Sequence, residues 1–185
     1  PVAAPAATGA ESQTVAGAPT ANLTAGCVEA FDPNVDYFPE KISLTHTEGF
    51  TVEYHNSYKV ITVATPWPGA EDAQQYVLVQ CGAPQPDGFD AAPIIEVPVQ
   101  HIATMSTSYL PFLDAYGLLD RLVAVDDSTY VNNSTVLAMA EAGDLAQIGY
   151  GAGVNVEQLL ELAPDLVMTY GSGSPEYDAH PVLIN

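Results

Sequence analysis

The residues that could carry out catalysis or bind a metal are not spaced for either task. The four histidines show no His-x-x-x-His or His-Glu-x-x-His spacing, and they are His46, His55, His101 and His180. The Gly-Ser-Gly-Ser run at residues 171–174 lacks the Gly-x-Ser-x-Gly register of a hydrolase nucleophile. Asp126 and Asp127 are adjacent carboxylates without the spacing of a calcium loop. We therefore predict that the protein is not an enzyme and has no resident metal or cofactor.

Charge excludes another class of function. The 185 residues include 23 acidic and only three basic side chains, and the formal net charge is −20. Such a surface repels phosphate backbones and anionic lipids, so nucleic-acid binding is excluded. The ordinary role of this charge is to keep the surface well solvated.

A hydrophobic content of 48% is enough for a packed core.

Alternating apolar and polar residues predict antiparallel strands in the first half of the chain. The strands are expected at residues 42–46, 50–54, 58–63 and 75–80. A Pro/Gly-rich stretch at 82–93 follows them. We therefore predict a β-rich segment over residues 27–93.

Strand-like and helix-like segments alternate from residue 94 to the end. Strands are expected at residues 94–105, with an interruption at Pro98, and at 122–125, 145–149 and 165–169. Helices are expected at residues 109–116, at 134–141, where Gly143 ends the helix, and at 155–163. Asn155 is the expected N-cap of the last helix, with Gln158 three residues later. The alternation predicts an α/β domain over residues 94–185 with a parallel sheet of βαβ units. Ligands of such sheets bind at the carboxyl ends of the strands, which selects the loops at 106–108, 126–133, 150–154 and 170–175.

The first 26 residues differ in composition from the rest. Residues 1–26 are rich in Ala, Pro, Gly, Ser and Thr, and such a segment buries too little apolar surface to offset the entropy of ordering. Two interpretations remain open: a flexible tether left after export, joined to a lipid anchor upstream of residue 1, or a disordered terminus. No apolar run approaches the roughly 20 residues of a membrane-spanning helix.

The two cysteines, Cys27 and Cys81, lie just after this segment and at the end of a predicted strand. An even number of cysteines in an exported chain favours a disulfide, which would join the start of the fold to the β-rich segment. Two free thiols are the alternative.

The expected location of the protein is outside the cytoplasm, either periplasmic or at the cell surface.

The order of motifs over residues 97–173 resembles a class of solute-binding proteins that serve iron-siderophore, haem and cobalamin ABC importers. The resemblance covers under half of the chain. It is carried by Ala-Thr-Met-Ser at 103–106, Tyr-Gly-Leu-Leu-Asp-Arg-Leu-Val-Ala-Val at 116–125, Ile-Gly-Tyr-Gly at 148–151 and Asn-Val-Glu-Gln-Leu-Leu-Glu-Leu-Ala-Pro-Asp-Leu-Val at 155–167. The last run is the most specific.

The resemblance implies the amino-terminal lobe of a two-lobed periplasmic binding protein, with the second lobe missing and the natural chain continuing past Asn185. It places the ligand, a small-molecule metal chelate, against the loops selected above. The ligand-binding residues that it implies are Ser106, Thr107, Tyr130, Tyr150, Gly151, Tyr170 and Ser172. The tyrosines would offer flat apolar faces with a hydroxyl group, although packing on the core is the alternative for each.

The resemblance also implies a partner, the permease of an ABC importer, whose arginines would contact Glu157. A carboxylate in the first turn of a helix also stabilises that helix, so both roles stay open. The only arginine, Arg121, lies beside a strand start, away from the selected loops. A neutral or cationic complex is therefore favoured over a trianionic catecholate, and cobalamin, a ferric hydroxamate and haem are the ligands that stay open.

Two other functions compete with this one. The first is an extracellular structural or adhesive module, in which residues 41–80 are the working part. The second is a metal-dependent hydrolase, which would need clustered His and Asp residues that the sequence lacks.

Overall fold

The computed structural model describes residues 18–66, 70–174 and 176–183. They divide into two compact units that adjoin in the sequence between Pro98 and Val99. Residues 18–98 are called the β unit below, and residues 99–183 the α/β unit. A β-rich unit followed by a unit with a parallel sheet is the predicted fold class, which is confirmed.

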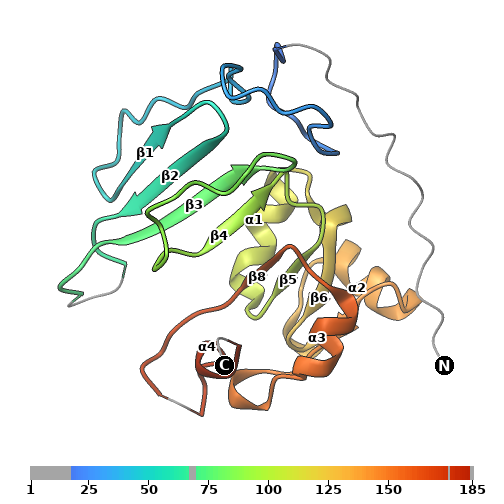
Figure 1. Ribbon diagram of the computed structural model, residues 1–185. Coiled ribbons are helices and arrows are strands. Elements are labelled where there is room, and N and C mark those ends of the chain that lie inside the picture. Colours follow the sequence, from blue (N-terminus) through green and yellow to red (C-terminus); the bar gives the residue numbers. More distant parts are fainter. Residues whose placement is uncertain (1–17, 67–69, 175, 184–185) are drawn as a thin grey trace. The chain divides into compact units, whose positions relative to one another are not determined.

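The β unit contains a four-stranded sheet in the order β1-β2-β3-β4 (Figure 1). Its strands are β1 Phe50–Tyr54, β2 Tyr58–Val63, β3 Gln74–Gln80 and β4 Ile94–Val97. The first three pair antiparallel, as predicted, whereas β4 pairs parallel with β3. Val60, Val77 and Val79 are fully buried in the described structure and form the centre of this sheet.

The predicted strand at residues 42–46 is wrong, because these residues pair with no other strand. Ile42 is 58% exposed and its backbone N–H donates to the phenolic oxygen of Tyr54 at 3.1 Å. Leu44 is 36% exposed. An alternating pattern stabilises a strand only where a neighbour completes its hydrogen bonds and a core covers its apolar side. Residues 42–46 meet neither condition and are irregular.

The segment predicted as one interrupted strand, residues 94–105, forms two strands in two different sheets. Ile94–Val97 pairs with β3, and Ile102–Thr104 belongs to the α/β unit. Pro98 lies between them because it has no N–H with which to continue the ladder of β4. The division between the units thus falls five residues after the expected boundary at 93/94.

The predicted disulfide between Cys27 and Cys81 is confirmed. Beside it, the backbone N–H of Val28 donates to the carbonyl oxygen of Cys81 at 2.8 Å. Gly82 has a φ of +88°, and a Cβ there would lie 2.1 Å from the carbonyl oxygen of Val28. Only glycine fits this close approach.

Most of the predicted tether, residues 1–17, lies outside the described residues. Near its predicted end, Asn22 exchanges three hydrogen bonds of 2.9–3.1 Å with Glu40. These bonds attach the described part of the segment to the β unit.

The α/β unit contains a four-stranded parallel sheet in the order β7-β6-β5-β8. Its strands are β5 Ile102–Thr104, β6 Leu122–Val125, β7 Ala146–Gln147 and β8 Leu166–Met168. Its α-helices are α1 Leu110–Ala115, α2 Ser134–Ala142, α3 Val156–Leu162 and α4 His180–Leu183. Short 3₁₀ turns are η1 Thr107–Tyr109, η2 Leu119–Arg121, η3 Ser128–Tyr130 and η4 Gly151–Gly153.

Helices cover both faces of the parallel sheet. Alternate strand residues point to opposite faces, so Ile102 and Ala103 of β5 belong to different core clusters. One cluster joins the sheet to α1 and α2 through Leu110, Leu113 and Val136. The other joins it to α3 and α4 through Leu159, Val182 and Leu183. Burial on both faces explains why the strands are almost uniformly apolar.

The helix ends show why these residues form helices. Asn133 accepts hydrogen bonds from the backbone of Thr135 and Val136, at 3.0 and 3.2 Å, and starts α2. Asn155, the predicted N-cap, accepts from the backbone of Gln158 at 3.1 Å and starts α3. The helix α3 ends at Ala163, which has a left-handed φ of +43°. Within the described residues, no helix is long and apolar enough to cross a membrane.

Candidate functional site

The strand order identifies the candidate binding edge of the parallel sheet. From β5 the chain proceeds to β6 and β7 on one side, and then crosses to β8 on the other side of β5. Ligands of open α/β sheets bind at such a reversal, outside the carboxyl ends of the strands. The loops that follow the four strands form the carboxyl edge, defined as residues 105–109, 126–133, 148–155 and 169–179 except residue 175. All the predicted ligand-binding residues lie on it.

The loops after β5 and β8 flank the reversal and are joined to each other. The phenolic oxygen of Tyr109 donates to the carbonyl oxygen of Thr169 at 2.7 Å. The backbone N–H of Met105 donates to the carbonyl oxygen of Met168 at 2.8 Å. Ser106 and Thr107 are half-buried, and the Ser106 hydroxyl accepts from the backbone of Ser108 at 3.2 Å. The Ser106 side chain thus caps η1.

The loop after β6 carries two carboxylates in contrasting environments. Burial raises the pKa of the Asp126 carboxyl above its ordinary value, although a hydrogen bond of 2.8 Å from the Asp127 backbone opposes this shift. Asp127 accepts hydrogen bonds from the side chain and backbone of Thr129, and these lower its pKa. Tyr130, in the same loop, is 70% exposed.

The loop after β7 contains Tyr150 and Gly151, which differ in burial. Tyr150 is 60% exposed, whereas Gly151 is buried. A Cβ on Gly151 would lie 2.5 Å from the carbonyl oxygen of Glu176 and 3.1 Å from the Cα of Tyr177. Gly151 therefore allows the loop after β8 to pack against the loop after β7.

The loop after β8 is closed by Asp178, a buried carboxylate. Its oxygens accept hydrogen bonds from the backbone and hydroxyl of Ser172, at 2.6 and 2.7 Å, and from the backbone of Gly173 at 2.9 Å. The predicted ligand residue Ser172 thus uses its hydroxyl within the loop. Tyr170 and Tyr177 flank this closure and are 43% and 52% exposed.

Exposure rules out the core-packing role that was the alternative for the tyrosines. Tyr130, Tyr150 and Tyr170 do not pack in the core, and each is available to a ligand. Sequence reasoning missed Tyr177 and Asp178 because it ended the last loop at Pro175. No apolar run follows Pro175 before residue 179, and this pattern indicates that the loop after β8 continues past Pro175.

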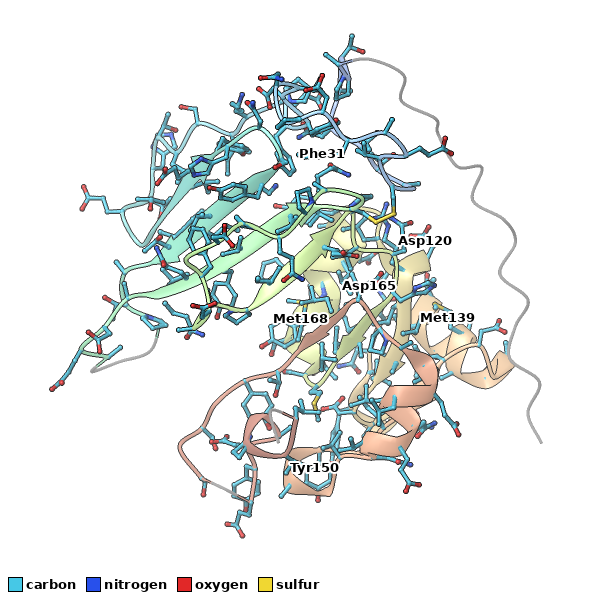
Figure 2. The ribbon with its side chains drawn as sticks, viewed as in Figure 1. Phe31, Asp120, Met139, Tyr150, Asp165 and Met168 are labelled. Carbon is cyan, nitrogen blue, oxygen red and sulfur yellow. A yellow bond between two sulfur atoms is a disulfide. The ribbon has the colours of Figure 1, made fainter. Side chains whose placement is uncertain are left out.

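The carboxyl edge is acidic and aromatic. Its sequence contains no lysine, arginine or histidine, but it does contain Asp126, Asp127, Glu176 and Asp178. Arg121 precedes β6 and lies at the opposite edge, where its guanidinium donates to the carbonyl oxygen of Val99. Figure 2 shows Tyr150 at one end of the α/β unit, and Asp120 and Asp165 at the other.

Glu157 lies in the first turn of α3 and is exposed. Leu160 and Glu161, one turn along the same helix, are also exposed. Exposure permits contact with a partner, and the position in the first turn also permits stabilisation of α3. Both roles therefore remain open.

Neither the pocket of the β unit nor a cluster of metal-binding side chains offers a second site within the described residues. A pocket of about 440 Å³ lies in the β unit, lined by residues that include Glu71, Asp72 and Phe89. It contains none of the predicted ligand-binding residues. Among the described residues, no three His, Cys, Asp or Glu side chains gather closely enough to hold a metal ion.

No protein-family model matches the chain, and no solved structure does. Over 88 residues the chain is 28% identical to a vitamin B12-binding protein of Vibrio parahaemolyticus. The match includes 47% of this chain, which spans 29% of the length of that relative. Similarity to a binding protein agrees with the prediction that the chain is not an enzyme. At this level, the chain resembles part of a small-molecule binding protein.

Proposed function

We propose that the chain is the ligand-recognising part of an extracytoplasmic binding protein that delivers a metal complex to an ABC importer. The observation that carries the proposal is the carboxyl edge, on which Tyr130, Tyr150, Tyr170 and Tyr177 are all exposed. Tyrosines combine a flat apolar face with a hydroxyl group, which suits a large ligand with both apolar and polar groups. The partial similarity to a vitamin B12-binding protein supports the same class of ligand.

The charge of the carboxyl edge narrows the ligand to a neutral or cationic complex. Anionic ligands are normally bound by arginine or lysine, and the edge has neither. Cobalamin or a ferric hydroxamate fits this edge better than a trianionic ferric catecholate. A disulfide is compatible with a location outside the cytoplasm, where such ligands are captured.

Titration of the full-length protein tests the proposed ligand class. The probes are cyanocobalamin, a cationic ferric trihydroxamate and a ferric tris-catecholate, followed by tyrosine and tryptophan fluorescence. We expect saturable binding of one of the first two and none of the third. Failure of all three to bind would sink the proposal, and tight binding of the catecholate would overturn the charge argument.

Substitutions test whether the tyrosines make the contact. Tyr150→Ala and Tyr177→Ala should each weaken binding by about threefold to tenfold, the usual loss for one aromatic contact. The matched control is Tyr116→Ala, because Tyr116 is 77% exposed but follows α1 at the opposite edge of the sheet. Equal losses in all three variants would argue against the carboxyl edge as the binding surface.

We propose that Glu157 contacts a basic surface of the permease. Glu157→Gln should reduce ligand-dependent stimulation of the importer ATPase while leaving ligand affinity unchanged, since exposed charges mainly speed association. The matched control is Glu161→Gln, which removes an exposed carboxylate from the last turn of α3. If Glu157 only stabilises the helix, the substitution should lower thermal stability and leave stimulation intact.

A further inference from the structure

Asp178 is the most heavily hydrogen-bonded carboxylate on the carboxyl edge. It is 4% exposed. One of its oxygens accepts from both the backbone N–H and the hydroxyl of Ser172, and the other accepts from the backbone N–H of Gly173. The carbonyl oxygen of Ser174 accepts in turn from the backbone of Tyr177 and Asp178, at 2.9 and 3.1 Å. Both ends of residues 172–178 are therefore tied to each other.

These hydrogen bonds hold Asp178 firmly to Ser172 and Gly173. A carboxylate that is almost fully buried is stable only when donors surround it. Hydrogen bonds to an ionised group are shorter and about twice as strong as neutral ones. Within this loop, the distances of 2.6 and 2.7 Å to Ser172 fall in that short range.

The segment that Asp178 closes contains one exposed tyrosine, closely follows a second and packs beside a third. Tyr170 precedes the closed segment and Tyr177 adjoins Asp178. The backbone of residues 176–177 packs over Gly151, the neighbour of Tyr150. The backbone N–H of Ala152 also donates to the carbonyl oxygen of Glu176 at 3.4 Å. Displacing Asp178 would therefore disturb three of the four exposed tyrosines of the carboxyl edge.

We infer that Asp178 is a positioning residue that preforms the tyrosine surface of the carboxyl edge before a ligand arrives. The inference rests on the proposed function and explains how the protein reaches its affinity for the ligand. A surface that is already ordered loses less entropy on binding than one that must first be ordered. Asp178 contributes to affinity through the loop and does not contact the ligand.

A graded set of variants tests this role. Ser172→Ala removes the hydrogen bond from the Ser172 hydroxyl to Asp178. Asp178→Asn replaces the carboxylate oxygen that accepts from the Gly173 N–H by an amide group that cannot accept, and Asp178→Ala removes both carboxylate oxygens. We expect affinity for the probe that binds, cyanocobalamin or the ferric trihydroxamate, to fall in that order. The loss should reach about tenfold for Asp178→Asn, the usual effect of leaving a donor without its charged partner. Amide exchange at Ser172 and Gly173 should accelerate in the same order.

Asp165→Asn is the matched control. Asp165 also uses its carboxylate to accept two backbone hydrogen bonds, from Gln100 and His101 at 2.7 and 2.8 Å. It precedes β8, at the opposite end of the strand from Asp178. The control should lose stability but keep its affinity for the probe, which separates positioning of the tyrosines from a general effect on the fold.

The outcomes separate this inference from the proposed function. Equal affinity of Asp178→Asn and the wild-type protein would overturn the inference while leaving the function intact. Equal loss of affinity in Asp165→Asn would also overturn it. If the wild-type protein binds no probe, the proposed function fails, and the role of Asp178 is then judged by amide exchange alone. Unchanged exchange at Ser172 and Gly173 in Asp178→Asn would then refute the inference.

Discussion

The phenolic oxygen of Tyr109 donates a hydrogen bond of 2.7 Å to the carbonyl oxygen of Thr169, residues that are 60 positions apart. Tyr109 ends η1, after β5, and Thr169 follows β8. The bond therefore spans the point where the strand order reverses. It holds the two flanking loops at a fixed separation.

Tyr109→Phe should destabilise the α/β unit by about 1 kcal/mol, because one hydrogen bond is lost while the ring remains. Urea denaturation measures this change, and amide exchange at Tyr170 should accelerate with it. Tyr116→Phe is the control, since Tyr116 is 77% exposed. The same loss in both variants would show that the bond to Thr169 has no special role.

Gly151→Ala should destabilise the α/β unit by roughly 2–4 kcal/mol, from an unfavourable positive φ and a steric overlap. The backbone at Gly151 has a φ of +57°, and the added Cβ would lie 2.5 Å from the carbonyl oxygen of Glu176. The substitution should also weaken binding of the probe.

Gly153 provides the control for this substitution, because an added Cβ there meets nothing within 4 Å. Gly153→Ala should change stability by less than about 0.5 kcal/mol. Thermal unfolding of the two variants tests the contrast. Similar melting temperatures would contradict the close packing of the two loops.

Asp126 and Asp127 should contribute to stability with opposite dependence on pH. The folded-state pKa of Asp126 is raised above 3.8. Its contribution to the stability of the folded state is therefore fully present below pH 3.8 and is lost as the pH rises through the folded-state pKa. The folded-state pKa of Asp127 is lowered from 3.8, so its contribution is present above that pH and is lost as pH falls.

Asparagine substitutions at these positions test the two signs. Asp126→Asn should raise the free energy of unfolding at pH 7, and the gain should shrink as the pH approaches 3.8. Asp127→Asn should lower the free energy of unfolding at pH 7, and this decrease should disappear as the pH falls below 3.8. Chemical denaturation at several pH values measures both slopes, and slopes of the same sign would contradict the assignment.

Removing the disulfide should destabilise the β unit strongly. Cys27 and Cys81 are 54 residues apart, and closing a loop of that length reduces the entropy of the unfolded chain by an amount worth about 4 kcal/mol. Paired Ser substitutions, followed by urea denaturation, measure the loss. The wild-type protein under reducing conditions should behave like the paired variant, and an oxidised protein no more stable than the reduced one would contradict the prediction.

Local signals in the sequence predicted most elements of the α/β unit. Asn155 followed by Gln158, and Gly143 after an apolar helix, mark helix ends through bonds between near neighbours. The apolar run at residues 122–125 predicted β6 because both faces of that strand are buried. These features depend on residues close in sequence, so they can be recognised without a structure.

Features that depend on distant residues were not predicted. Whether Ile42 and Leu44 form a strand depends on a partner strand, and the sequence does not show that none is present. The role of Asp178 depends on Ser172 and Gly173 across a closed loop. The packing of Gly151 against residues 176–177 depends on a contact between two separate loops. Tertiary contacts decide each of these cases.

Ala163 offers a practical means of studying the carboxyl edge. Its left-handed φ of +43° is unfavourable for any residue with a Cβ, and it lies at the end of α3 away from that edge. Ala163→Gly should therefore stabilise the fold by about 1 kcal/mol. Variants of Gly151 or Asp178 that fold poorly can be purified and assayed in this stabilised background, so that loss of binding is measured separately from loss of folded protein.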